Sequence, residues 1–225
     1  TLEKMWDKTE ENISIPATDM EHYAEHPDVI FVCVKGYSLQ ETIPFIKRIA
    51  RKNTIVIPVL NIYGTGGKMQ KELPDLLVTD GCIYVSANIK EPGKLLQHGQ
   101  ILHIVFGVRD KAEFRPELKE IQKDLCDSHI DGTLSENIRR EALEKFSYVS
   151  PIGAAGLYYH ATAADFQKEG EARELFKTMV KEIAALAEAM GVPFQKDMAE
   201  VNLKILSNLA PEATTSMQRD IMAGK

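Results

Sequence analysis

Excess positive charge and long apolar runs are missing from this sequence. Its 225 residues include 27 basic and 33 acidic side chains, which gives a formal net charge of −6. This balance excludes a general attraction to nucleic acid or to an anionic membrane, and leaves room for a local basic pocket that binds an anionic ligand. No stretch approaches the roughly 20 apolar residues that a transmembrane helix needs. With 44% hydrophobic and 27% charged residues, the composition is that of an ordinary globular protein.

Cysteine is also scarce. Cys33, Cys82 and Cys126 are odd in number and far apart, which argues against a disulfide framework and against a paired-cysteine metal site. Two of them lie in apolar, strand-like runs. We therefore expect reduced, buried thiols in a cytoplasmic protein.

The six histidines show no metal-binding pattern. His22 and His26 share one face only if their segment is helical, and no third ligand is evident nearby. His98 precedes Gly99 and is equally compatible with a loop contact and with a turn. No metal site is predicted.

What the sequence does contain is an alternation of short apolar runs and amphipathic stretches in its first half. Each run is rich in β-branched residues and nearly continuous in apolarity, as expected for a strand covered on both faces. The runs are Val29–Val34, Thr54–Leu60, Cys82–Ala87 and Ile101–Gly107.

Helices are predicted between the first runs. Ser38 and Glu41 have the spacing of a capping box, which opens a helix to about Ala50 that buries Ile43, Ile46 and Ile49. A second helix is expected over Gly66–Leu77. Strand, helix and strand at this spacing predict a parallel α/β sheet. The stretch Ala87–Gly99, with its proline and glycine, is expected to be a loop or a hairpin that gives the sheet an antiparallel edge.

The second half has the character of an all-α domain. Beyond Asp131–Ser135 there is almost no strand signal. Ser135 is expected to cap a helix that runs to about Tyr148, and Phe166–Met190 repeats apolar residues at helical spacing until Gly191 and Pro193 end it. A further helix is expected over Lys196–Ala210. We therefore place a domain boundary near residue 135, and the predicted fold class is α/β, with a partial Rossmann-type parallel sheet followed by an all-α domain.

Two polar residues end predicted strands. In a doubly wound sheet, ligands bind beyond the carboxyl ends of the strands, where Lys35 and Asn61 are expected. A lysine there offers a positive charge to a phosphate or carboxylate, and an asparagine both donates and accepts hydrogen bonds. Either residue is equally explained as the first solvated position after a strand.

The glycine-rich segment Asn61–Lys68 invites interpretation as a phosphate-binding loop. That pattern requires glycine where Ile62 stands and serine or threonine where Met69 stands, so the segment does not fit. It also lacks the third glycine of a dinucleotide fingerprint. A flexible glycine-rich turn near a ligand is the better prediction.

Lys145 and Ser216 are the candidates in the second half. Lys145 precedes the run of small and apolar residues Ser150–Gly156; a lysine that faces a partly dry cleft can serve as a proton donor. The alternative is an ordinary surface lysine. The segment Thr214–Ser216 would by itself be a loop or a helix cap.

Taken together, these segments resemble the ketopantoate reductase family, over essentially the whole chain. The Thr215–Ile221 segment is the most specific, because it resembles the family's serine-methionine-x-x-aspartate-isoleucine sequence. The matching segments, in chain order, are Pro27–Lys35, Ile57–Asn61, Glu91–Gly93, His98–Gly99, Phe106–Gly107, Lys145–Phe146, Thr215–Ile221 and Gly224.

The resemblance implies reduction of 2-dehydropantoate (ketopantoate), or of a related branched 2-oxo acid, by NADPH, as in pantothenate biosynthesis. It implies that Lys145 is the catalytic general acid and that Ser216 binds substrate. It also implies that Lys35 binds the cofactor and that Asn61 contacts both ligands. On this basis residues 1–135 are the C-terminal part of an NADP-binding domain, and residues 136–225 are a substrate domain. Lys35 and Lys145 are then expected to converge on one crevice.

The chain also departs from the family. Ile62 stands where the family has glycine, and Val149 and Gly153 stand where it has asparagines. The family's opening glycine-rich turn would lie before Thr1, which is not a methionine, and its later substrate-binding glutamate would lie just past Lys225. We therefore expect an excised or truncated piece, and predict that residues 1–225 by themselves bind NADPH weakly.

Two alternatives remain open. The missing asparagines are compatible with a non-catalytic homologue that binds a ligand, and the architecture is compatible with another β-hydroxyacid dehydrogenase-like enzyme. The sequence leaves the oligomeric state open, with a homodimer as one alternative.

Overall fold

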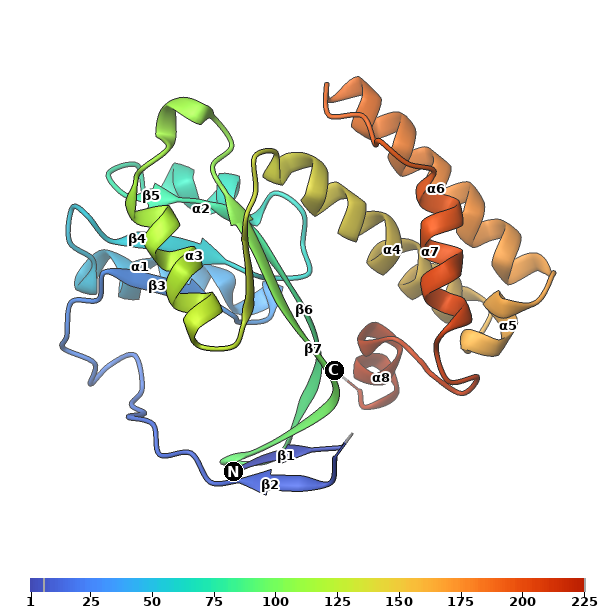
Figure 1. The fold of residues 1–225 in the computed structure, drawn as a ribbon, viewed down its shortest axis with the longest axis horizontal. Helices are drawn as coiled ribbons and strands as arrows, with labels where there is room; N and C mark the ends of the chain where they lie inside the picture. Colours follow the sequence, from blue (N-terminus) through green and yellow to red (C-terminus); the bar gives the residue numbers. More distant parts are fainter. Residues whose placement is uncertain (6, 225) are drawn as a thin grey trace. The chain divides into compact units, whose positions relative to one another are not determined.

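The computed structural model describes residues 1–5 and 7–224. They form two compact units, with the boundary between Ile138 and Arg139. The first unit combines β-sheets with helices and the second is helical (Figure 1). This confirms the predicted fold class. No helix of the described part of the chain is long and apolar enough to cross a membrane.

A small parallel sheet lies at the centre of the first unit. Its strands follow the order β3-β4-β5, and every residue of β4 is buried because the sheet is covered on both faces. Helix α1 connects β3 to β4, and helix α2 connects β4 to β5. The bounds are β3 Val29–Val32, α1 Leu39–Ile49, β4 Ile55–Pro58, α2 Thr65–Glu72 and β5 Leu77–Val78.

Helix α1 buries Ile43, Ile46 and Ile49, as predicted. The predicted capping box is wrong, because the Ser38 side chain makes no capping hydrogen bond. A 3₁₀ turn, η1 (Gly36–Ser38), leads directly into α1, and the Ser38 N–H donates to the Lys35 carbonyl at 3.0 Å. The helix therefore begins from a backbone turn rather than from a side-chain cap.

A long hairpin forms the second sheet. Strands β6 (Asp80–Glu91) and β7 (Lys94–Gly107) are antiparallel and are joined by a turn at Pro92 and Gly93, where Gly93 adopts a φ of 79°. The hairpin alternative for Ala87–Gly99 is thus confirmed. Both strands are longer than the apolar runs predict. Their outer halves are exposed, and exposed strand residues need not be apolar, so the sequence pattern did not indicate this extension. His98 lies within β7 rather than in a turn, and its Nε2 is 2.7 Å from Asn88 Oδ1.

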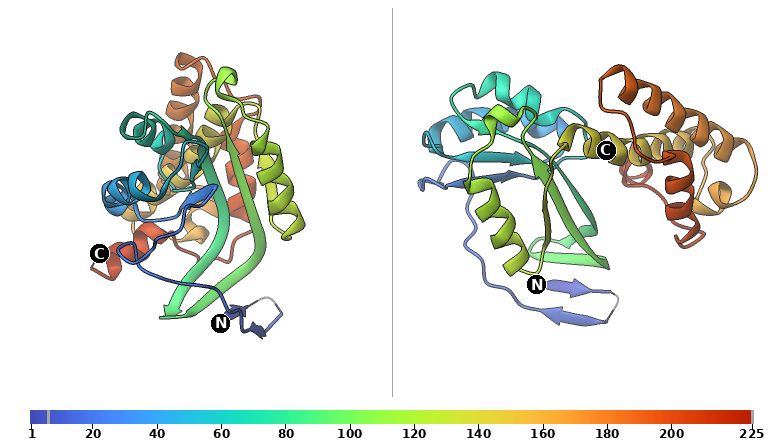
Figure 2. Two further views of the ribbon diagram at one scale, coloured as in Figure 1. Left: turned by 90° about the vertical axis from the view of Figure 1, so that its left-hand side faces the viewer. Right: turned by 45° about the horizontal axis from the view of Figure 1, so that its top comes forward.

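Three short strands of this unit lack an apolar pattern in the sequence. Helix α3 was not predicted, although it buries Leu118, Ile121 and Leu125 at helical spacing. β8 and β1 pair in parallel with different parts of β7, and β2 pairs with β1. Figure 2 shows the hairpin curving from the central strands toward β1 and β2. The bounds are β1 Leu2–Lys4, β2 Thr9–Glu11, α3 Glu117–Asp127 and β8 Asp131–Leu134.

Five helices make up the second unit. Their shared core includes Phe166 and Phe176, whose ring centroids lie 5.8 Å apart, and the fully buried Leu206. The helices are α4 Ile138–Tyr158, α5 Ala163–Gln167, α6 Glu171–Ala189, α7 Met198–Ser207 and α8 Ser216–Met222.

Two helix predictions need correction. The predicted Phe166–Met190 helix is divided into α5 and α6, because Gly170 takes an extended backbone conformation immediately before α6. Helix α4 continues past Tyr148 to Tyr158, through a stretch of small residues that α8 covers. The predicted stop at Gly191 is confirmed: its φ is 71°, and the Val192 N–H donates to the Ala187 carbonyl at 2.9 Å.

The thiols also differ from expectation. All three are free, and only Cys82 is buried. Strand β3 ends at Val32, so Cys33 lies in the loop beyond it, while Cys126 lies near the exposed end of α3. The prediction of buried thiols is wrong for these two residues.

Candidate functional site

Lys35 and Asn61 lie at the same edge of the parallel sheet. Val32 of β3 pairs with Pro58 of β4. Lys35 lies three residues after Val32, and Asn61 lies three residues after Pro58. The two loops touch: a Cβ added to Gly36 would lie 2.3 Å from Cδ1 of Ile62. Both candidate residues are exposed. The strand register and this close contact therefore bring the two loops together at the edge where α/β proteins bind ligands.

The contact also accounts for a departure from the family pattern. Ile62 lies over Gly36, and a side chain at residue 36 would require the end of the exposed Ile62 side chain to move. The larger residue at 62 thus fills space beside the glycine at 36.

The glycine-rich segment Asn61–Lys68 contains the start of α2, which is capped by a distant carboxylate. Gly64, with a φ of 76°, occupies the position before α2 and has no side chain to cap the helix. The N–H groups of Gly66 and Gly67 instead donate to the carboxylate of Asp80, which follows β5. A Cβ on Gly66 would lie only 2.0 Å from the Thr79 carbonyl oxygen, so this close approach requires glycine.

Asp80 thus occupies the positive end of α2. Because its carboxylate already accepts the N–H groups that would hold an anion, the segment does not act as a phosphate-binding loop. This result agrees with the mismatch of the segment to the phosphate-loop pattern.

Arg109 is the cation closest to this carboxylate. Its Nη1 lies 3.7 Å from Asp80 Oδ2, and its Nη2 donates to Gln70 Oε1 at 3.4 Å. Burial raises the pKa of Asp80, while the Arg109 charge and the two glycine N–H groups oppose the shift. Sequence patterns did not single out Asp80 or Arg109. The available signal was a helix start with adjacent glycines and no capping side chain.

Lys145 lies on α4 in the second unit and is half-buried. Two residues further, the buried Ser147 donates to the Glu144 carbonyl at 2.7 Å and accepts from Asn202 Nδ2 of α7 at 3.1 Å. Burial, followed by the repulsion of Glu141, raises the pKa of Glu144. The Ser147–Asn202 bond joins α4 to α7, so it restrains the rotation of the helix that carries Lys145.

Ser216 is the exposed first residue of α8. Thr215 and Gln218 form a capping box: the Thr215 hydroxyl accepts from the Gln218 N–H at 3.2 Å, and Gln218 Oε1 accepts from the Thr215 N–H at 2.9 Å. The helix-cap alternative for Thr214–Ser216 is therefore confirmed. Gln218 Nε2 also donates to the carbonyls of Gly156 and Ala161, at 3.1 and 2.8 Å. These bonds anchor the start of α8 to the end of α4.

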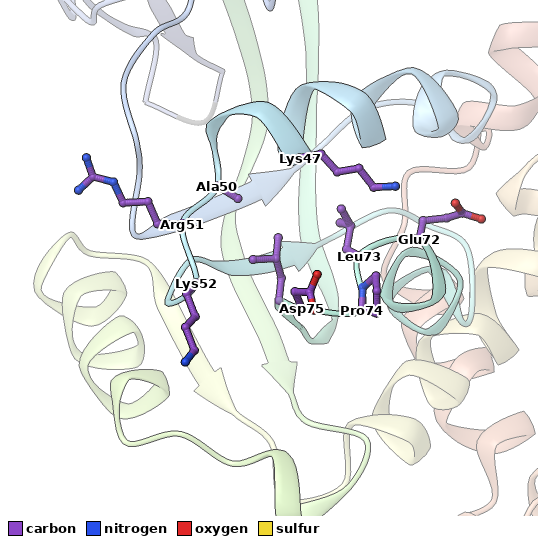
Figure 3. Close-up of a pocket in the computed structure, with 9 residues that line it drawn as sticks. Lys47, Ala50, Arg51, Lys52, Glu72, Leu73, Pro74 and Asp75 are labelled. Atoms are coloured by element: carbon purple, nitrogen blue, oxygen red, sulfur yellow. The ribbon is translucent and has the colours of Figure 1, made fainter.

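A surface pocket of about 480 Å³ lies elsewhere in the first unit. Figure 3 shows Lys47 extending toward Glu72, whereas Arg51 and Lys52 extend outward. Arg51 and Lys52 precede β4 and Asn61 follows it, so the pocket lies at the opposite end of that strand from Asn61. It is not part of the candidate site.

His22 and His26 have local partners. His22 Nδ1 is 2.7 Å from Asp19 Oδ1, and His26 Nδ1 is 2.8 Å from the Ile49 carbonyl oxygen. They do not share a helix face, because their segment is irregular. Among residues 1–5 and 7–224, no group of three or more histidine, cysteine or acidic side chains could hold a metal ion.

Comparison with known proteins assigns the class. Residues 3–111 match the family described as "Ketopantoate reductase PanE/ApbA", and residues 137–225 match "Ketopantoate reductase PanE/ApbA C terminal". The chain belongs to the ketopantoate reductase family.

Individual relatives agree with this assignment. A 2-dehydropantoate 2-reductase of Aquifex aeolicus is 21% identical over 212 residues, or 92% of this chain and 68% of its own length. A PanE/ApbA family ketopantoate reductase of Ralstonia eutropha superposes with a TM-score of 0.85 at 18% identity, covering all of this chain and 72% of its own. A D-mandelate dehydrogenase with NADH and anilino(oxo)acetate superposes with a TM-score of 0.81 at 16% identity, covering 96% of this chain and 70% of its own. The chain spans 65% and 68% of the length of the curated relatives that it matches.

Proposed function

We propose that this chain carries the substrate side and part of the cofactor side of a nicotinamide-dependent 2-oxo-acid reductase. The substrate is 2-dehydropantoate or a related branched 2-oxo acid, and the product is the 2-hydroxy acid. The observation that supports this most strongly is the match of both units to the ketopantoate reductase family, with Lys145 on α4 and Ser216 on the helix anchored to it.

Lys145 is the proposed general acid. A bound nicotinamide cofactor supplies the hydride to the ketone carbon. As negative charge grows on the ketone oxygen, the Lys145 ammonium stabilises it and donates the proton that completes the hydroxyl group. This interaction strengthens toward the transition state, which is the requirement for catalysis.

The other candidates position the ligands. Asn61 at the end of β4 offers a donor and an acceptor to substrate and cofactor, and the Ser216 hydroxyl binds the polar end of the substrate. Lys35, exposed at the same sheet edge, offers a positive charge to a cofactor phosphate. The residues present at this edge therefore fit an anionic dinucleotide, although α2 does not contribute its N-terminus.

NADPH is the proposed cofactor and NADH the alternative, since the D-mandelate dehydrogenase relative is described with NADH. That relative also supports a second candidate function, reduction of an arylated 2-oxo acid by a β-hydroxyacid dehydrogenase-like enzyme. A non-catalytic, ligand-binding homologue is the remaining alternative, motivated by Val149 and Gly153 in place of asparagines.

The test uses the product of the complete reading frame that contains this chain. Oxidation of NADPH and of NADH is followed with a panel of 2-oxo acids, including ketopantoate. We expect turnover with at least one acid, and a loss of about 10²–10⁴-fold in kcat for Lys145→Ala, because the proton donor is removed.

Lys181→Ala is the matched control, since Lys181 is an exposed lysine on α6 of the same unit. Its turnover and the circular dichroism of both variants should match the parent protein. Unchanged turnover in Lys145→Ala would remove Lys145 from the mechanism, and the absence of turnover with every acid would favour the non-catalytic homologue.

A further inference from the structure

Two positions of α4 that follow Lys145 at helical spacing, Val149 and Gly153, have no hydrogen-bonding side chain. Val149 and Gly153 come after Lys145 at intervals of four residues, so the three positions lie along one side of the helix. Val149 is half-buried and Gly153 is buried. A substrate group beside Val149 therefore meets methyl groups and no hydrogen-bonding side chain.

Met217 extends this apolar surface. A Cβ placed on Gly153 would lie 3.2 Å from Met217 Cε and 3.3 Å from its Sδ, so the thioether rests directly on the glycine. Met217 is still 44% exposed, which leaves one side of the thioether open to a ligand. The neighbouring Gln218 holds this turn of α8 in place through its bonds to Gly156 and Ala161.

We call the surface formed by Val149 and Met217 the apolar wall. At the start of α8 this wall lies next to a polar side chain. Ser216 supplies a hydroxyl, and Met217, next to it, supplies a polarizable apolar side chain that adapts to irregular shapes. The polar group suits the carboxylate end of a 2-oxo acid, and the thioether suits an apolar substituent.

We propose that Val149 and Met217, whose thioether lies over Gly153, bind the side chain of the substrate, and that this chain prefers 2-oxo acids with a branched-alkyl or aryl substituent and no side-chain hydroxyl. The inference rests on the proposed function and narrows its substrate class. A hydroxyl placed against this wall loses its water without gaining a partner, so the hydroxylated substrate is disfavoured.

One pair of substrates isolates the effect. Ketopantoate and trimethylpyruvate differ only by the hydroxyl on the substituent. With the product of the complete reading frame, we expect kcat/KM to be about tenfold or more higher for trimethylpyruvate. Met217→Gln, which adds a hydrogen-bonding amide, should narrow or reverse the preference, whereas the apolar control Met217→Leu should keep it.

A binding measurement separates this inference from the proposed function. In protein labelled with ¹³C at its methionine methyls, trimethylpyruvate should shift the Met217 resonance more than ketopantoate does. Met198, which is buried in the core of the same unit, is the control resonance and should stay in place.

The outcomes are distinct. Turnover that favours ketopantoate, or a preference that Met217→Gln leaves unaltered, overturns the apolar wall and leaves the reductase function intact. A selective Met217 shift without turnover of any acid supports the wall and overturns the reductase function. If no acid is turned over and the Met217 resonance does not shift, both the apolar wall and the reductase function are overturned.

Discussion

Asp80 is a residue whose role depends on the tertiary structure. It supplies the cap that Gly64 cannot supply to α2, and it brings a carboxylate into a buried position beside Arg109. The Lys35 and Asn61 candidates show the opposite case, because the end of an apolar run was enough to locate both near one sheet edge. Their roles, and that of Lys145, stay predictions that substitution will test.

Replacing Asp80 should weaken the first unit. Asp80→Ala leaves the N–H groups of Gly66 and Gly67 and the Arg109 guanidinium without their carboxylate, and we expect a loss of about 2–4 kcal/mol in the free energy of unfolding. Urea denaturation measures it. Asp110→Ala is a control at an exposed acidic residue near Arg109, and it should cost less, because the Asp110 cap of its short 3₁₀ turn lies at the surface.

The raised pKa of Asp80 adds a pH dependence of definite sign. Because the folded state holds the proton more tightly than the unfolded state, the stabilisation from protonated Asp80 is fully present below the ordinary value of 3.8 and is lost as pH rises through the raised pKa. The stability of the parent protein relative to Asp80→Asn, which cannot titrate, should therefore fall over that range. A relative stability that rises with pH would contradict the burial of this carboxylate.

At the scale of elements, the start of α8 depends on one amide. Gln218 is buried and closes the capping box with Thr215. It also donates to the Gly156 carbonyl near the end of α4 and to the Ala161 carbonyl in the loop that follows. The same contact explains why α4 continues beyond its predicted end, since Gly156 permits Gln218 to approach its backbone closely.

Gln218→Ala should release α8. The variant loses the hydrogen bonds to Gly156 and Ala161, so we expect a cost of about 1–3 kcal/mol and faster hydrogen exchange of the α8 amides than of the α6 amides. Gln195→Ala, at an exposed glutamine of the same unit, should leave both exchange rates unchanged. Equal protection of α8 in the two variants would show that other contacts hold this helix.

At the scale of the whole molecule, each compact unit has its own core. The helical unit buries Phe166, Phe176 and Leu206 among its own helices. We therefore predict that residues 139–225 fold by themselves, with a helical circular dichroism spectrum and cooperative thermal unfolding.

A core variant provides the control for that prediction. Phe176→Ala should destabilise the isolated unit by about 3–5 kcal/mol, because it leaves a cavity among α5, α6 and α7. A non-cooperative transition in the parent segment would mean that its core depends on the rest of the chain.

What the sequence by itself determined were the features that depend on local patterns. Apolar runs located β3 and β4, helical spacing located the buried isoleucines of α1, and Gly191 located the end of α6, because each of these follows from residues close together in the chain. The family resemblance likewise rested on short segments that can be compared directly.

Only the tertiary structure decided which distant residues meet. The pairing of β1 with β7, the capping of α2 by Asp80 and the contact of Met217 with Gly153 all depend on contacts between segments that are not neighbours in the sequence. Such pairings leave no periodic signal, because a solvated strand residue, a non-local cap and a glycine beneath a side chain each look ordinary among their sequence neighbours.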